Sequence, residues 1–174
     1  MKNINLKSIL VSAFVLLASL SSQAQISKAE IIATGLTCSM CSNAINKQLK
    51  SMAEVENVAV DLNTNTFTVS LKENNTLTPN VLKENIEKTG FFIGSMVLTI
   101  DLGTTKIEES KAVKKQSGTY VFVNGGDKTI DGAIKVQVLN DGFVTKKEFK
   151  KSAKLQAKYA DLVAQENTYL LKSI

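Results

Sequence analysis

Two cysteines separated by two residues are the part of this sequence best suited to chemistry. Cys38 and Cys41 lie in Gly-Leu-Thr-Cys-Ser-Met-Cys, residues 35–41, and the 174-residue chain has no other cysteine and no histidine. A pair of thiolates at this spacing can hold one soft ion, Cu(I) first on abundance and Hg(II) as the alternative. Zn(II) prefers four ligands. The chain has no histidine, and the residue before the first cysteine is Thr37, so four such ligands are not available. We expect Met40 to point away from the pair.

Two cysteines separated by two residues also occur in structural disulfides and in thiol-disulfide oxidoreductases. In an oxidising compartment the pair can close into a structural disulfide within an interaction module. It can also serve a thiol-disulfide oxidoreductase, whose motif usually has an aromatic residue before it and a proline inside it. Here Ser39 and Met40 lie between the cysteines, and the only proline, Pro79, is better explained as a helix start. Both alternatives stay open beside metal binding.

A strand and a helix must position the two cysteines. Residues 30–34, Glu-Ile-Ile-Ala-Thr, predict a strand immediately before the motif. The helix predicted after it has apolar residues at steps of three and four, namely Cys41, Ala44, Ile45, Leu49 and Met52. A helix N-terminus has partial positive charge and unpaired N–H groups, which favour the thiolate form of a cysteine placed there.

Residues 28–100 predict the order strand, helix, strand, strand, helix, strand. After the first helix we expect strands at 58–62 and 67–71 joined as a hairpin, a helix at 79–89 and a strand at 96–100. Thr78 and Pro79 have the chemistry of an N-cap and a first helical residue, and Gly90 ends that helix. This order predicts an α+β, ferredoxin-like βαββαβ sandwich.

Motif and element order together resemble the heavy-metal-associated domain of copper chaperones, copper-pump modules and the periplasmic mercury-binding protein. The resemblance rests on residues 35–41, 58–61 and 88–91. It implies that Cys38 and Cys41 are the metal ligands. Where the family usually has Met this chain has Leu36, which would pack in the core, and Phe91 stands where pump modules have an aromatic residue, as expected of a receiving or storage module.

The function implied by the resemblance is binding and delivery of Cu(I), or of Hg(II), by ligand exchange, without enzyme activity. The implied partners are a metal donor or acceptor protein such as a copper transporter, together with a metal-bridged dimer of the chain itself.

The first 24 residues predict a secretory signal peptide. Lys2 and Lys7 precede an apolar run at 9–20, and Ser22-Gln23-Ala24 offers a cleavage site. Twelve residues are too few to span a bilayer comfortably. We therefore expect an exported chain, periplasmic or secreted, without stable membrane insertion, with residues 25–101 as the metal domain and 102–174 as a second region.

The net charge of the chain is modest and does not favour nucleic-acid binding. All 21 basic residues are lysine against 16 acids, so the formal charge is +5, and it falls to +3 without Lys2 and Lys7. Nucleic-acid binding normally shows clustered Lys and Arg with base-reading contacts. We expect no nucleic-acid partner.

Residues 102–174 predict a small strand-rich region followed by one long C-terminal helix. Strands are expected at 118–123 and 133–139, and a capping box at Thr145 to Glu148 would start a helix that runs into the 160s. We interpret the lysines of this helix as a solvated face. The remaining apolar candidates of the chain, Met52, Met96, Phe91 and Phe92, are predicted to pack in the core or cover the site.

Overall fold

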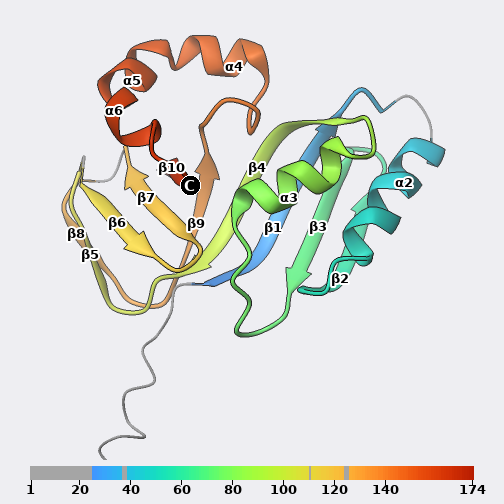
Figure 1. The fold of residues 1–174 in the computed structure, drawn as a ribbon, viewed down its shortest axis with the longest axis horizontal. Coiled ribbons are helices and arrows are strands. Elements are labelled where there is room, and N and C mark those ends of the chain that lie inside the picture. The colour runs from blue at the N-terminus through green and yellow to red at the C-terminus, as the bar shows by residue number, and fades with distance from the viewer. Residues whose placement is uncertain (1–24, 37–38, 110, 124–125) are drawn as a thin grey trace, which may run out of the picture.

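One mixed eight-stranded sheet runs through the described part of the protein. The computed structural model describes residues 25–36, 39–109, 111–123 and 126–174, so the predicted signal peptide lies outside the described residues. The strand order is β2-β3-β1-β4-β9-β10-β7-β6, and β5 and β8 form a separate two-stranded sheet. In Figure 1 helices α2 and α3 lie against the β1–β4 half, while α4, α5 and α6 lie at the end of the chain beside β7 and β9.

The first half has the predicted ferredoxin-like order. Its elements are β1 (Gln25–Thr34), α2 (Ser39–Lys50), β2 (Val55–Asp61), β3 (Thr66–Leu71), α3 (Pro79–Glu87) and β4 (Phe92–Asp101). Strand β1 lies between β3 and β4 and is antiparallel to both, and β2 and β3 form the predicted hairpin. Along β1 the buried residues Ala29, Ile31 and Ala33 alternate with more exposed ones, as a strand buried on one face requires.

Helices α2 and α3 bury apolar faces on this sheet. Ile45 and Leu49 of α2 and Leu82 and Ile86 of α3 are fully buried in the core cluster that includes the strands. Ala44, predicted on the apolar stripe of the first helix, is exposed instead. As predicted, Thr78 is the N-cap residue of α3 and Pro79 begins the helix, although the Thr78 side chain makes no cap hydrogen bond.

The second half extends the edge of the first. Its strands are β5 (Thr105–Ile107), β6 (Ala112–Lys115), β7 (Gly118–Phe122), β8 (Lys128–Ile130), β9 (Ala133–Val138) and β10 (Thr168–Ser173). Strand β9 pairs antiparallel with β4 from Val97 to Asp101, so the edge that β4 would otherwise leave open is hydrogen-bonded. Strand β10 lies between β9 and β7 and runs parallel to β7. The boundary at 101/102 stays a prediction.

The predicted long C-terminal helix is wrong. The segment forms three short helices, α4 (Lys146–Lys151), α5 (Ala153–Lys158) and α6 (Ala160–Val163), with breaks at Ser152 and Tyr159. The N-terminal cap is as predicted, because the Thr145 side chain accepts from the Glu148 backbone N–H. The reciprocal half of the capping box does not form, since Glu148 Oε1 accepts from Gln137 Nε2 at 3.0 Å and the Thr145 N–H donates to a carbonyl of β4.

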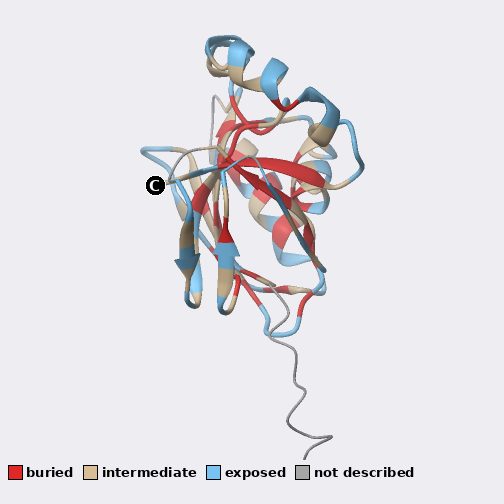
Figure 2. Ribbon diagram, turned by 90° about the vertical axis from the view of Figure 1, so that its left-hand side faces the viewer, coloured by how far each residue is buried: buried red, intermediate tan, exposed pale blue. Residues whose placement is uncertain are grey.

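Two apolar clusters hold the sheet from its two faces. Tyr120, Tyr169 and Leu171 share the large cluster with the first half, whereas their strand neighbours Val121 and Leu170 point the other way and pack beneath α4–α6. Figure 2 shows the buried strands in red and the outer sides of the helical segment in pale blue. In the described part of the chain, no helix has both the length and the apolar character to cross a membrane.

Candidate metal centre

The turn from β1 to α2 brings the cysteine motif to one end of the sheet. Strand β1 ends at Thr34, which is paired with Phe92 at the start of β4. Gly35 follows with φ +84°, a left-handed conformation that residues with a Cβ rarely adopt. Leu36 then packs on the large core cluster, as expected for the position where the family usually has Met. The chain is therefore fixed to the sheet and the core immediately before the two cysteines.

Cys41 lies in the first turn of α2 and is partly buried. Its neighbour Ser42 is 4% exposed, and Ile45 and Leu49 are fully buried, so the helix is fixed against the core directly behind the motif. The first turn contains no acidic residue. A negative charge at Cys41 would therefore meet the positive end of the helix without competition from a carboxylate in that turn.

Cys38, the other predicted ligand, lies outside the described residues. The assignment of Cys38 and Cys41 as the ligand pair stays a prediction. Within the described ranges, no three residues of the types His, Cys, Asp and Glu gather in a group that could hold a metal ion.

The exposure of the predicted aromatic and methionine side chains near the motif and in the core agrees with prediction except at one residue. Phe91 packs on the core, and its Cδ1 lies 3.8 Å from the place that a Cβ on Gly35 would occupy. The prediction that Phe92 covers the core is wrong, because its side chain is 64% exposed where β4 begins, opposite Thr34, and its predicted covering of the site stays a prediction. Met40 is 81% exposed, and Met96 is fully buried as predicted.

The turn of the β2–β3 hairpin lies at the same end of the sheet. The Ala33 backbone N–H donates to the Asn65 carbonyl at 3.2 Å, which joins this turn to the last residues of β1. Within the turn, the hydroxyl of Thr64 donates to Asp61 Oδ2 at 2.9 Å and the backbone N–H of Asn63 donates to Oδ1 at 2.9 Å. These bonds hold the pKa of Asp61 below its ordinary value, the Thr64 bond being the largest cause.

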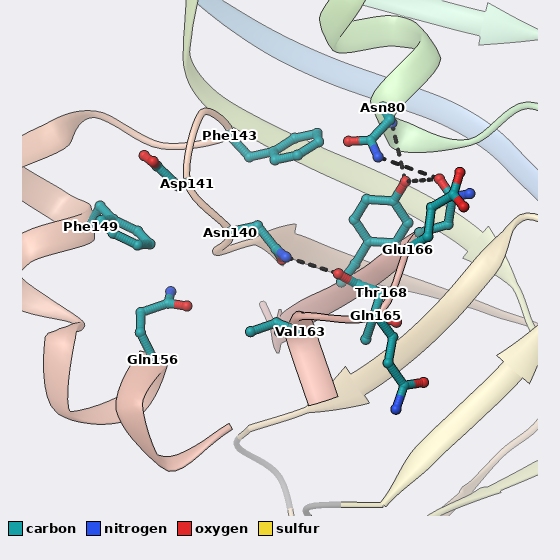
Figure 3. Close-up of a pocket in the computed structure, with 12 residues that line it drawn as sticks. Asn80, Asn140, Asp141, Phe143, Phe149, Gln156, Val163, Gln165, Glu166 and Thr168 are labelled. Carbon is teal, nitrogen blue, oxygen red and sulfur yellow. Dashed lines mark hydrogen bonds between the residues drawn. The ribbon is translucent and has the colours of Figure 1, made fainter. Parts of the chain in front are cut away.

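A cavity of about 360 Å³ lies away from the motif, between α3 and the C-terminal segment. Figure 3 shows Asn80 of α3 on one side and Asn140, Phe149 and Gln156 on the other. Side-chain amides that line the cavity form hydrogen bonds with other groups of the protein. Asn140 Nδ2 donates to the Thr168 carbonyl at 2.9 Å, and Asn140 Oδ1 accepts from the Leu170 N–H at 2.7 Å.

A tyrosine from β10 caps α3 in this region. The Tyr169 hydroxyl accepts from the Asn80 backbone N–H at 3.3 Å and donates to Asn167 Oδ1 at 3.1 Å. It thereby supplies a partner for an N-terminal N–H of α3 that Thr78 leaves unsatisfied. No local signal in the sequence could have found this contact, because the two residues are 89 positions apart.

The comparisons agree with the motif. The sequence model of the heavy-metal-associated domain matches residues 30–92. The yeast copper transporter domain Ccc2a, solved in apo and Cu(I)-loaded states, is 36% identical over 37% of this chain and 86% of its own, with a TM-score of 0.34.

Two further solved structures match a similar share of the chain. The N-terminal domain of a potential copper-translocating P-type ATPase from Bacillus subtilis, in the Cu(I)-loaded state, is 33% identical over 38% of this chain and 82% of its own, with a TM-score of 0.35. The Cu(I)-loaded first domain of the human copper chaperone for SOD1, CCS, is 27% identical over 42% and 93%, with a TM-score of 0.34. A comparison with curated proteins finds no match. Through residues 30–92, the chain belongs to the heavy-metal-associated domain family.

Proposed function

We propose that this protein is an exported carrier that holds Cu(I) between the thiolates of Cys38 and Cys41 and delivers it to another protein. The observation that carries the proposal is the position of Cys41 in the first turn of α2, within a heavy-metal-associated domain. The similar domains from yeast, Bacillus subtilis and human have been solved with Cu(I) bound. Two thiolates suit a soft ion of low coordination number, and Hg(II) has the same preference.

The charge of the proposed complex fits the helix start. Cu(I) with two thiolates has a net charge of −1, and the positive end of α2 stabilises an anion placed there. The first turn of α2 contains no acidic residue, so no carboxylate there competes with the anionic complex for the positive end of the helix.

Delivery is proposed to occur by ligand exchange without oxidation or reduction. A thiol of the partner loses its proton and forms a third Cu–S bond, after which the bond to one cysteine of this chain breaks and that sulfur takes up a proton. Repetition at the second cysteine completes the transfer. Met40, inside the motif, and Phe92, which is paired with Thr34 before it, are exposed apolar side chains that a partner can contact. A copper transporter or another metal donor or acceptor fits this role.

The test is an anaerobic Cu(I) competition titration against a coloured chelator, made on reduced residues 25–174. We expect one tightly bound Cu(I), and loss of that binding in the Cys38→Ser, Cys41→Ser double variant. Met40→Leu is the matched control in the same turn, and it should bind as the wild type does, because the 81% exposed Met40 side chain is not assigned as a ligand.

Equal, weak binding by the wild type and the double variant would refute the copper proposal. The reduction potential of the pair then separates the remaining alternatives. A thiol-disulfide oxidoreductase should lie near the poise of its compartment, whereas a structural disulfide should lie below about −300 mV. A titration with Hg(II) in the same format measures the preference between the two ions.

A further inference from the structure

The positive charge of the protein is concentrated on one segment. Residues 146–158 contain six lysines and one glutamate, a net charge of +5. The remainder of residues 25–174 contains thirteen lysines against fifteen acids, a net charge of −2. The basic character of the chain from residue 25 onward therefore belongs to helices α4 and α5, and the rest of it is slightly acidic.

The six lysines form one exposed face, which we call the lysine face: Lys146, Lys147, Lys150, Lys151, Lys154 and Lys158. At 3.6 residues per turn these positions fall within an arc of about 140°. The Gln156 N–H donates to the Ser152 carbonyl at 2.9 Å, so helical bonding crosses the break between α4 and α5 and keeps the arc nearly continuous. Phe149 and Leu155 lie on the opposite side and pack toward the sheet.

Carboxylates of the protein do little to neutralise this face. In the described part of the chain, Lys158 pairs with Glu109 at 3.7 Å, and no ion pair involves the other five lysines. Glu148, the single acid of the segment, turns to Gln137 on β9 instead. The field of five ammonium groups is thus left for a partner outside the chain.

The composition of the lysine face selects the kind of partner. Protein interfaces are depleted in Lys at their centre and depend on buried aromatic or apolar anchors. None of the large exposed apolar side chains of the described residues lies between 146 and 158. Lysine is a flexible point charge without the rigid fork by which arginine recognises particular groups, so it suits a diffuse negative field. We propose that the lysine face docks on an anionic phospholipid membrane surface.

The start of the lysine face is bonded to the end of the sheet that carries the cysteine motif. The Thr145 N–H, at the start of α4, donates to the Gly94 carbonyl of β4 at 3.1 Å, and Val144 forms an isolated bridge with Ser95. These residues follow Phe92, which pairs with the last residue of β1 before the cysteine motif. In Figure 1, α4 and the end of β1 both lie in the upper part of the view. Docking would therefore hold the motif near the membrane, a consequence that rests on the proposed function.

The test is flotation of residues 25–174, metal-free and reduced, with vesicles of phosphatidylcholine containing about 30% phosphatidylglycerol. The apolar N-terminal run must be absent, because it would bind lipid by itself. We expect binding to the anionic vesicles and none to pure phosphatidylcholine. A variant with Lys147, Lys150 and Lys154 replaced by Gln should bind on the order of 100-fold more weakly, since each lysine near an anionic surface contributes about five-fold. At 1 M salt, where the Debye length is about 3 Å, binding should disappear.

The matched control removes the same charge elsewhere. Lys28, Lys88 and Lys114 are exposed and form no ion pair with the described residues, and their replacement by Gln should leave vesicle binding within about two-fold of the wild type. Equal loss in the two triple variants would overturn the proposal, because net charge alone would then explain binding. Retention of an acidic polypeptide such as polyglutamate without vesicle binding would also overturn it, and would assign the face to an acidic protein. Copper plays no part in this assay, so its outcome is independent of the titration above.

Discussion

Replacing Tyr169 by Phe tests whether the C-terminal strand β10 caps the N-terminus of helix α3. The variant keeps the ring of a residue that is 1% exposed, and so creates almost no cavity. It removes the hydroxyl that accepts from Asn80 N at 3.3 Å and donates to Asn167 Oδ1 at 3.1 Å. At about 1 kcal/mol for each net hydrogen bond, unfolding free energy should fall by about 2 kcal/mol. For a chain of this size the melting temperature should fall by about 4–8 °C.

The assays are urea unfolding of the reduced, metal-free protein and hydrogen exchange of the peptide covering residues 79–87. Tyr120→Phe is the matched control, because the Tyr120 hydroxyl is also buried but is 2.6 Å from Ser117 Oγ within the second half. We expect both variants to lose stability, and only Tyr169→Phe to accelerate exchange at the start of α3. Unchanged exchange in that peptide, or a loss below about 0.5 kcal/mol, would refute the capping role, since even one lost bond is expected to exceed it.

Three other perturbations have defined outcomes. Gly118→Ala should lower unfolding free energy by about 2–4 kcal/mol in urea titrations, because φ is +141° and the new Cβ would lie 2.8 Å from the Tyr169 ring. Thr145→Ala should cost about 1 kcal/mol in the same assay through loss of the α4 N-cap, with Thr145→Ser close to the wild type. Burial raises the pKa of Tyr120 and of Tyr169, so both stay protonated in the folded protein at a pH where the unfolded chain ionises. Stability should therefore be constant with respect to these groups below about pH 10 and fall as the pH rises above it, at a rate that unfolding at several pH values measures and that Tyr169→Phe should reduce.

The first half of the fold could be predicted because its signals are local. The alternation in 58–62 and 67–71, the Pro79 helix start and the spacing of Ile45 and Leu49 each act within a few residues, and the structure has the corresponding elements. The domain match to residues 30–92 agrees with the family predicted from the motif.

The second half was harder to predict because several of its elements are short. Strands β5, β6 and β8 have only three or four residues each, too few for a clear period of two. The apolar stripe predicts one long helix, but the structure breaks it at Ser152 and Tyr159, and Leu155 and Tyr159 pack in a cluster with the strand residues Val121 and Leu170. The burial of Leu170 and Leu171 in a strand flanked by β9 and β7 depends on partners that lie far away in the sequence, such as Val138 and Phe122.

X-ray absorption at the copper edge measures directly whether two protein sulfurs hold Cu(I). Residues 25–174 would be loaded with one equivalent of Cu(I) under reducing, anaerobic conditions and freed of the reductant. We expect a Cu(I) edge with sulfur as the only scatterer bonded to the metal, and loss of this spectrum in the Cys38→Ser, Cys41→Ser variant. Nitrogen or oxygen scatterers bonded to the copper, or the same spectrum from the double variant, would contradict it.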